Sequence, residues 1–105
     1  MSTKIVQINF KFDGTRAGYE KENEAYTQPI AHLPGLRWKV WIINEDQSEA
    51  GGIYLFDNDA AVQGFMDGPI VAELKGIPTL DLKTFDVIEG LSKVTRAPLA
   101  EAQQV

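Results

Sequence analysis

Residues 36–56 read LRWKVWIINEDQSEAGGIYLF, and this stretch predicts the centre of the fold. Both of its ends are rich in aromatic and β-branched residues, which favour strands, and the polar residues 45–48 lie between them. We therefore expect a β-hairpin with strands over 36–44 and 49–56. Gly51 and Gly52 interrupt the second strand, which indicates a bulge, a close approach of two backbones or room for a ligand.

The residues before the hairpin predict a strand and then a helix. From Lys4 to Phe12 apolar and polar side chains alternate, which is typical of a half-buried strand. Thr15 can cap the helix that follows, because its hydroxyl can accept a bond from a free N–H group of the first turn. The apolar stripe of this helix contains Tyr19, Tyr26, Ile30 and Leu33. Pro29 cannot donate a backbone hydrogen bond, so we expect a kink there and the end of the segment at Pro34-Gly35.

The residues after the hairpin predict a second crossover and a last strand. A cap at residues 57–59 precedes short helical patterns over 61–66 and 69–74, and a strand over about 79–88 follows. The order β-α-β-β-α-β predicts a ferredoxin-like α+β fold, with helices on one face of a four-stranded antiparallel sheet. We expect one domain over 1–105. Residues 90–105 would form a C-terminal arm that is either loosely ordered or reaches a partner subunit.

The face of the sheet without helices predicts a homodimer. We expect Trp41 and Ile43 on that face, together with Phe85 and Val87. Left uncovered, these side chains would form a large apolar patch, and a second copy of the chain is the simplest cover for it.

Composition excludes several kinds of partner. The 105 residues carry a formal net charge of -5, which repels nucleic acid, and no long apolar run predicts a membrane segment. We expect a cytoplasmic protein. The chain has no cysteine and one histidine, so thiolate chemistry is excluded and a protein-held metal is not expected. Signatures of nucleotide binding, phosphate binding and common hydrolases are also absent, and we expect no cofactor.

Aromatic side chains predict a pocket for a flat organic compound between the sheet and the helices. We take Trp38 and Tyr54 as candidate catalytic residues, because each carries a polar group that must find a partner when buried. Candidate substrate-binding residues are Trp41, Tyr26 and Phe65. For Phe65 a purely structural place in the core is the favoured alternative.

Three polar residues are further candidates. His32 could relay a proton and is a third candidate catalytic residue, although a cap at the helix C-terminus is the favoured alternative. Asn9 could orient a substrate carbonyl or make an interface hydrogen bond. Lys39 could stabilise an oxyanion beside an indole ring, although an interface ion pair with a carboxylate such as Glu49 is favoured. The acidic run around Glu22 is expected to be solvated helix surface.

Four blocks of the sequence carry a resemblance to a known family. They are PGLRWKVW at 34–41, EAGGIYLF at 49–56, QINFKF at 7–12 with Gly14, and FDV at 85–87 with Leu91-Ser92. Together they span nearly the whole chain, and on them the sequence resembles the YdhR-type monooxygenases. Pro29 departs from the pattern of that family, so the helical wall of the pocket is expected to differ.

The resemblance implies a dimeric α/β barrel and an oxidation of a phenolic or quinone-forming aromatic by dioxygen without a cofactor. In such enzymes the deprotonated substrate itself supplies the electrons. The resemblance also implies pocket or hydrogen-bonding roles for Trp38, Trp41 and Tyr54, with Lys39 and Asn9 secondary. Two other functions stay open, because a fold does not fix a function. One is a small-molecule-binding or stress-related dimer without enzymatic activity, and the other is haem degradation with His32 on the iron.

Overall fold

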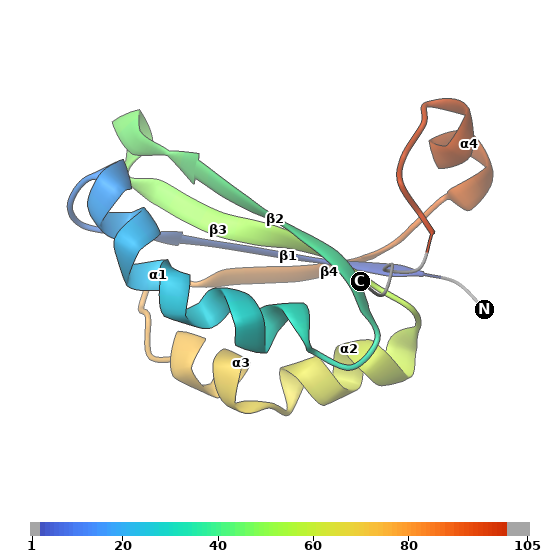
Figure 1. Ribbon diagram of the computed structural model, residues 1–105, viewed down its shortest axis with the longest axis horizontal. Helices are drawn as coiled ribbons and strands as arrows, with labels where there is room; N and C mark the ends of the chain where they lie inside the picture. The colour runs from blue at the N-terminus through green and yellow to red at the C-terminus, as the bar shows by residue number, and fades with distance from the viewer. Residues whose placement is uncertain (1–2, 101–105) are drawn as a thin grey trace.

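Four antiparallel strands form a single sheet in the computed structural model, which describes residues 3–100. Their order is β2-β3-β1-β4, so β1 (Lys4–Lys11) and β3 (Glu49–Phe56) are central, while β2 (Leu36–Asn44) and β4 (Asp81–Asp86) form the edges. The helices α1 (Arg16–Ala31), α2 (Asp59–Met66) and α3 (Pro69–Leu74) all lie on one side of this sheet (Figure 1). This arrangement confirms the ferredoxin-like α+β fold, including the hairpin of β2 and β3.

Side-chain caps begin the helices where the sequence predicts them. Thr15 accepts a hydrogen bond from the amide of Gly18 at 3.1 Å, and Asn58 accepts one from the amide of Ala61 at 2.9 Å. Pro29 lies in the last turn of α1, which continues to Ala31. The expected end at Pro34-Gly35 is therefore a few residues too late. The connection between β2 and β3 forms a short 3-10 helix, η1 (Glu45–Gln47).

The core lies between the helices and the sheet. It is built from side chains that are 0–5% exposed, namely Val6, Ile8, Ile30, Tyr54, Phe56, Phe65 and Val71. The strand residues in this set alternate along β1 and β3, as a sheet covered on one face requires. None of the helices within residues 3–100 is long and apolar enough to span a membrane.

A β-bulge in β2 decides which side chains face the helices. Leu36 pairs with Phe56 but Trp38 pairs with Leu55, so Arg37 is the extra residue. Because one extra residue reverses the alternation of a strand, Lys39, Trp41 and Ile43 face the helices, and Trp38, Val40 and Ile42 face away.

The expected place of Trp41 and Ile43 on the face without helices is therefore wrong. Phe85 does lie on that face, because its neighbour Thr84 pairs with the buried Val6. Val87 lies beyond the end of β4.

The C-terminal arm begins with α4 (Glu89–Val94), which lies apart from the other helices (Figure 1). The amide and the hydroxyl of the buried Thr3 both donate to Glu89 Oε2, each at 3.1 Å. Further along, Trp38 Nε1 donates to the carbonyl of Pro98 at 2.6 Å, and Arg37 Nη1 donates to that of Leu99. The described part of the arm thus contacts its own chain, and residues 101–105 lie outside the described residues.

Gly51 and Gly52 are sites of close approach, as the sequence predicts among its alternatives. We expect Gly51→Ala to lower the free energy of unfolding by about 2–3 kcal/mol, because an added Cβ would lie 1.8 Å from the carbonyl oxygen of Ile8. Gly64→Ala in α2 is the matched control, since a Cβ there meets nothing within 4 Å and alanine favours a helix. Urea unfolding of both variants measures the effects. Equal stability of Gly51→Ala and wild type would contradict this account of the sheet.

Candidate functional site

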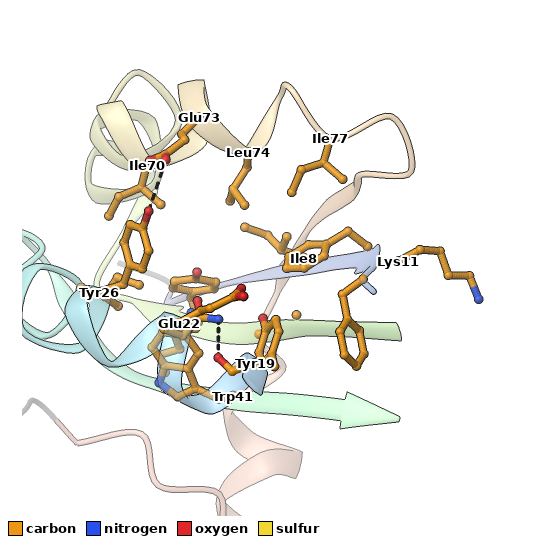
Figure 2. Close-up of a pocket in the computed structure, with 18 of the residues that line it drawn as sticks. Ile8, Lys11, Tyr19, Glu22, Tyr26, Trp41, Ile70, Glu73, Leu74 and Ile77 are labelled. Atoms are coloured by element: carbon orange, nitrogen blue, oxygen red, sulfur yellow. Dashed lines mark hydrogen bonds between the residues drawn. The ribbon is translucent and has the colours of Figure 1, made fainter. Parts of the chain in front are cut away.

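A cavity of about 510 Å³ opens between the helix-facing side of the sheet, α1 and α3 (Figure 2). Its sheet wall comes from β1, β2 and β3, and its helical wall from one face of α1 and from α3 with the loop that follows. The lining residues that matter below are Asp13, Tyr19, Glu22, Asn23, Tyr26, Lys39, Trp41, Gly52, Tyr54 and Glu73. Four aromatic or aliphatic residues, Ile8, Phe10, Leu74 and Ile77, make much of the remaining surface apolar.

Lys39 brings an amine into this cavity against two aromatic faces. Its Nζ lies 3.2 Å from the ring centroid of Trp41 and 4.6 Å from that of Tyr54. Lys39 forms no ion pair with residues 3–100, and the expected ion pair across an interface with a carboxylate such as Glu49 stays a prediction. Burial lowers the pKa of Lys39 to about 7, while the ring faces favour the cation and oppose part of this effect. Both the amine and the ammonium are therefore accessible near neutral pH.

Gly52 provides the room that Lys39 occupies. It lies opposite Trp41 in the ladder of β2 and β3, and a Cβ on Gly52 would stand 2.5 Å from Cε of Lys39. Any larger residue would therefore push the lysine chain off the sheet. Of the roles that the sequence left open for the two glycines, a close backbone approach applies to Gly51, which lies against Ile8. Gly52 makes room for the side chain of Lys39.

Tyr54 places a hydroxyl in the same region. The residue is 2% exposed, and its hydroxyl makes no hydrogen bond to residues 3–100. Within residues 3–100, however, every side-chain nitrogen or oxygen atom that is fully enclosed has a hydrogen-bond partner. The hydroxyl must therefore touch open space, and the cavity that Tyr54 lines is that space. Burial also raises the pKa of Tyr54, so the phenol stays protonated and can donate a hydrogen bond to a ligand.

The outer part of the cavity carries three carboxylates. The sequence predicts Glu22 to be solvated helix surface and predicts no site role for Asp13 or Glu73. The exposed residues Glu22, Glu73 and Asp13 line it. Tyr26 donates its hydroxyl hydrogen to Glu73 Oε1 at 3.2 Å and so links α1 to α3 (Figure 2). The sequence does contain a sign that Glu22 faces the cavity, since Glu22 lies three residues after Tyr19 and four before Tyr26 and so shares their face of the helix. Nothing local signals Glu73, because its place depends on how α3 packs against α1.

Four of the sequence-derived candidates lie outside the cavity, whereas Tyr26, Lys39, Trp41 and Tyr54 line it. Trp38 faces the opposite side of the sheet and contacts the arm through Pro98. Asn9 also faces that side, where its Oδ1 accepts a hydrogen bond from Gln7 at 3.0 Å. Phe65 is a core residue, with its ring centroid 4.9 Å from that of Tyr54.

His32 is exposed at the end of α1, where its backbone N–H caps the helix. Its Nδ1 lies 2.8 Å from the carbonyl of Gln28, and the ring does not line the cavity. This position gives no support to the haem hypothesis, which requires His32 to reach an iron in the pocket. No group of three or more His, Asp or Glu side chains within the described range 3–100 is arranged to hold a metal ion.

The lowered pKa of Lys39 predicts a pH-dependent stability. We expect Lys39→Met to raise the free energy of unfolding most at pH 7 and below, and less as the pH rises from about 7 toward 10.5. Across this interval the unfolded wild-type chain binds more protons than the folded one, so wild-type stability rises with pH. Urea unfolding at pH 6, 8.5 and 10 measures the difference, and the exposed Lys75→Met is the control. A difference between Lys39→Met and wild type that stays constant with pH would contradict the shift.

Comparisons with solved structures identify proteins of the same fold. SnoaB, a cofactor-independent oxygenase from Streptomyces nogalater solved as a mutant, is 15% identical with a TM-score of 0.65, covering 84% of this chain and 95% of that one. A monooxygenase from the gene ActVA-Orf6 of Streptomyces coelicolor, in complex with nanaomycin D, is 14% identical with a TM-score of 0.61, covering 82% and 88%. A heme-degrading protein from Mycobacterium tuberculosis is 19% identical with a TM-score of 0.61, covering 84% and 94%.

At these identities the likeness shows the fold alone, which is the ferredoxin-like α+β fold described above. No curated protein sequence matches the chain. The family model described as "Putative mono-oxygenase ydhR" matches residues 5–98, which include every residue that lines the cavity and all four strands apart from Lys4, the first residue of β1. The chain therefore belongs to the YdhR family.

Proposed function

We propose that this chain is a cofactor-independent monooxygenase that oxidises a small phenolic or quinone-forming aromatic compound with dioxygen. The observation that carries the proposal is the Lys39 amine, which lies against the Trp41 ring inside an aromatic-lined cavity. The volume of about 510 Å³ lies within the usual range of small-molecule pockets, about 300–1,000 Å³. The family description supports the reaction class, and the structural likeness to a cofactor-independent oxygenase is consistent with it.

In the proposed first step the neutral amine of Lys39 removes a proton from the substrate. A CH₂ group conjugated through aromatic rings to a ketone, as in an anthrone, suits such a base, since loss of the proton leaves a carbanion whose charge is delocalised onto the ketone oxygen. The new ammonium of Lys39 and the hydroxyl of Tyr54 then stabilise the oxyanion. Apolar walls exclude water and strengthen these interactions.

In the proposed second step the carbanion passes one electron to dioxygen, and the two radicals combine to form a carbon–oxygen bond. Protonation by Lys39 gives a hydroperoxide. Loss of the second proton from the same carbon then breaks the O–O bond and leaves a carbonyl and water. The CH₂ carbon loses four electrons, and dioxygen gains four. Because the substrate supplies all the electrons, the reaction requires no flavin, haem or metal from the protein.

An oxygen electrode tests the proposal directly. We expect purified protein to consume one dioxygen for each quinone formed, without release of hydrogen peroxide, with at least one member of a panel of anthrones, which carry the CH₂ group that the proposed steps require. Oxygen uptake must exceed the rate of spontaneous oxidation measured with heat-denatured protein. Binding of these compounds without oxygen uptake across the panel would contradict the proposal and would instead support a binding protein without enzymatic activity.

The face of the sheet without helices supports a second part of the proposal, a homodimer. Val40 is 49% exposed and Phe85 is 47% exposed, and both belong to this face, as do Trp38 and Ile42. Large apolar side chains that are exposed together on one face seldom remain in contact with water. A second copy of the chain would cover the two faces against each other and form the barrel that this fold implies.

A further inference from the structure

We propose that Glu22 and Glu73 make the cavity select aromatic compounds that carry no acidic substituent. This inference rests on the proposed function, because it names the substrate class of the same site. The first step concerns where the charges lie. Tyr54 and Lys39 form the inner end of the cavity, being buried and half-buried, whereas Glu22 and Glu73 are exposed and form its outer end.

The cationic side chains near the cavity do not balance these carboxylates. Lys11 lines the cavity, but its Nζ donates to the carbonyl of Gln47 at 2.9 Å, and its chain extends away from the other lining residues (Figure 2). Arg16 pairs with Glu20 at 3.2 Å beside a neighbouring groove between α1 and β2, which shares Tyr19, Asn23 and Trp41 with the cavity. Among the described lining residues, Lys39 is thus the one cation directed into the cavity.

A ligand that fills the cavity therefore has a cation and a hydroxyl donor at its inner end and two carboxylates at its outer end. The substrate oxygen that becomes the oxyanion belongs beside Lys39 and the Tyr54 hydroxyl. This inner end of the cavity favours negative charge. A ring substituent that points outward meets Glu22 from α1 and Glu73 from α3. Like charges at close range repel, so a carboxylate, sulfate or phosphate there weakens binding, while a neutral or cationic group does not.

The hydrogen bond from Tyr26 gives Glu73 a fixed place in this arrangement. It links the carboxylate of α3 to α1, the helix that also carries Glu22 (Figure 2). A glutamine at 73 would keep an oxygen that accepts from Tyr26 and would lose only the charge. The chain thus offers a substitution that separates charge from structure.

The test uses two ligands that differ in charge and that the proposed reaction cannot oxidise further. These are anthraquinone-2-carboxamide and anthraquinone-2-carboxylate, whose binding is followed by quenching of tryptophan fluorescence. We expect wild-type protein to bind the carboxamide about tenfold more tightly at low salt, and the difference to shrink in 0.5 M salt (roughly a 4–5 Å screening length). Glu22→Gln and Glu73→Gln should each reduce the ratio by about threefold.

Glu24→Gln is the matched control, because Glu24 lies two residues along α1 and lines the neighbouring groove, not the cavity itself. The ratio of its affinities for the carboxamide and the carboxylate should equal that of wild type. Thermal unfolding should confirm that all variants are folded. Equal or tighter binding of the carboxylate, failure to bind either ligand, or an equal effect of Glu24→Gln would each overturn the inference. Charge selection without any oxygen uptake would instead overturn the proposed oxidation and leave this inference standing.

Discussion

Replacing Lys39 by methionine is expected to lower the turnover of an oxidisable anthrone by about 10²–10⁴-fold, the usual contribution of a positioned acid–base group. Methionine keeps an unbranched chain of similar length, so it can still lie over Gly52 and against the Trp41 ring. It lacks both the amine that removes the proton and the ammonium that stabilises the oxyanion. Initial rates on an oxygen electrode, with kcat and KM separated, measure the change.

Two further variants define what the loss means. Lys75→Met removes an exposed lysine outside the cavity and should leave turnover unchanged. Lys39→Arg keeps a cation but removes the base, because arginine does not lose its proton near neutral pH. It should retain binding and lose turnover. If Lys39→Met oxidised its substrate at the wild-type rate, Lys39 could not be the base.

The pH profile carries the same argument with a definite sign. Only the neutral amine can accept a proton, and burial lowers the pKa of Lys39 to about 7. The value of kcat/KM should therefore rise with pH through about 7 and level off above it. Phenolic substrates that ionise in this range must be avoided, so a non-phenolic anthrone is the better probe. A profile that falls with rising pH would indicate that the ammonium form is the active one.

Most of the fold was predictable because its signals are local. Alternation along Lys4–Lys11, the caps at Thr15 and Asn58 and the polar break at residues 45–48 each act over a few residues, and each is found in the structure. The facing of β2 was not predictable in the same way. It depends on the bulge at Arg37, whose only sign is the pairing of β2 with β3.

That one bulge accounts for much of the difference between the expected and the observed site. It directs Trp38 to the face without helices and brings Trp41 and Lys39 into the cavity. The expected ion pair of Lys39 with a carboxylate such as Glu49 placed Lys39 at an interface. The reversed facing of β2 directs Lys39 toward the helices instead. The place of Glu73 was not predictable for a different reason, since its hydrogen bond with Tyr26 joins residues 47 positions apart.

Val40→Asp is expected to convert a wild-type homodimer into a monomer at micromolar concentration. Val40 is half exposed on the face without helices and pairs with Ile53, so a carboxylate there would be taken out of water if a second copy covered this face. In a two-fold symmetric dimer the substitution occurs twice and brings like charges toward one interface. A cost of several kcal/mol corresponds to a dissociation constant raised by about 10²–10⁴-fold.

Light scattering coupled to size-exclusion chromatography measures the mass, and Ala60→Asp provides the control. Ala60 is exposed near the N-terminus of α2, on the opposite side of the sheet, where an added negative charge suits the helix dipole. Ala60→Asp should therefore stay dimeric although its net charge equals that of Val40→Asp. The cavity lies on the helix side, so the Val40→Asp monomer should still bind anthraquinone-2-carboxamide. A monomeric wild-type protein would remove the reason for the apolar face and contradict the proposed barrel.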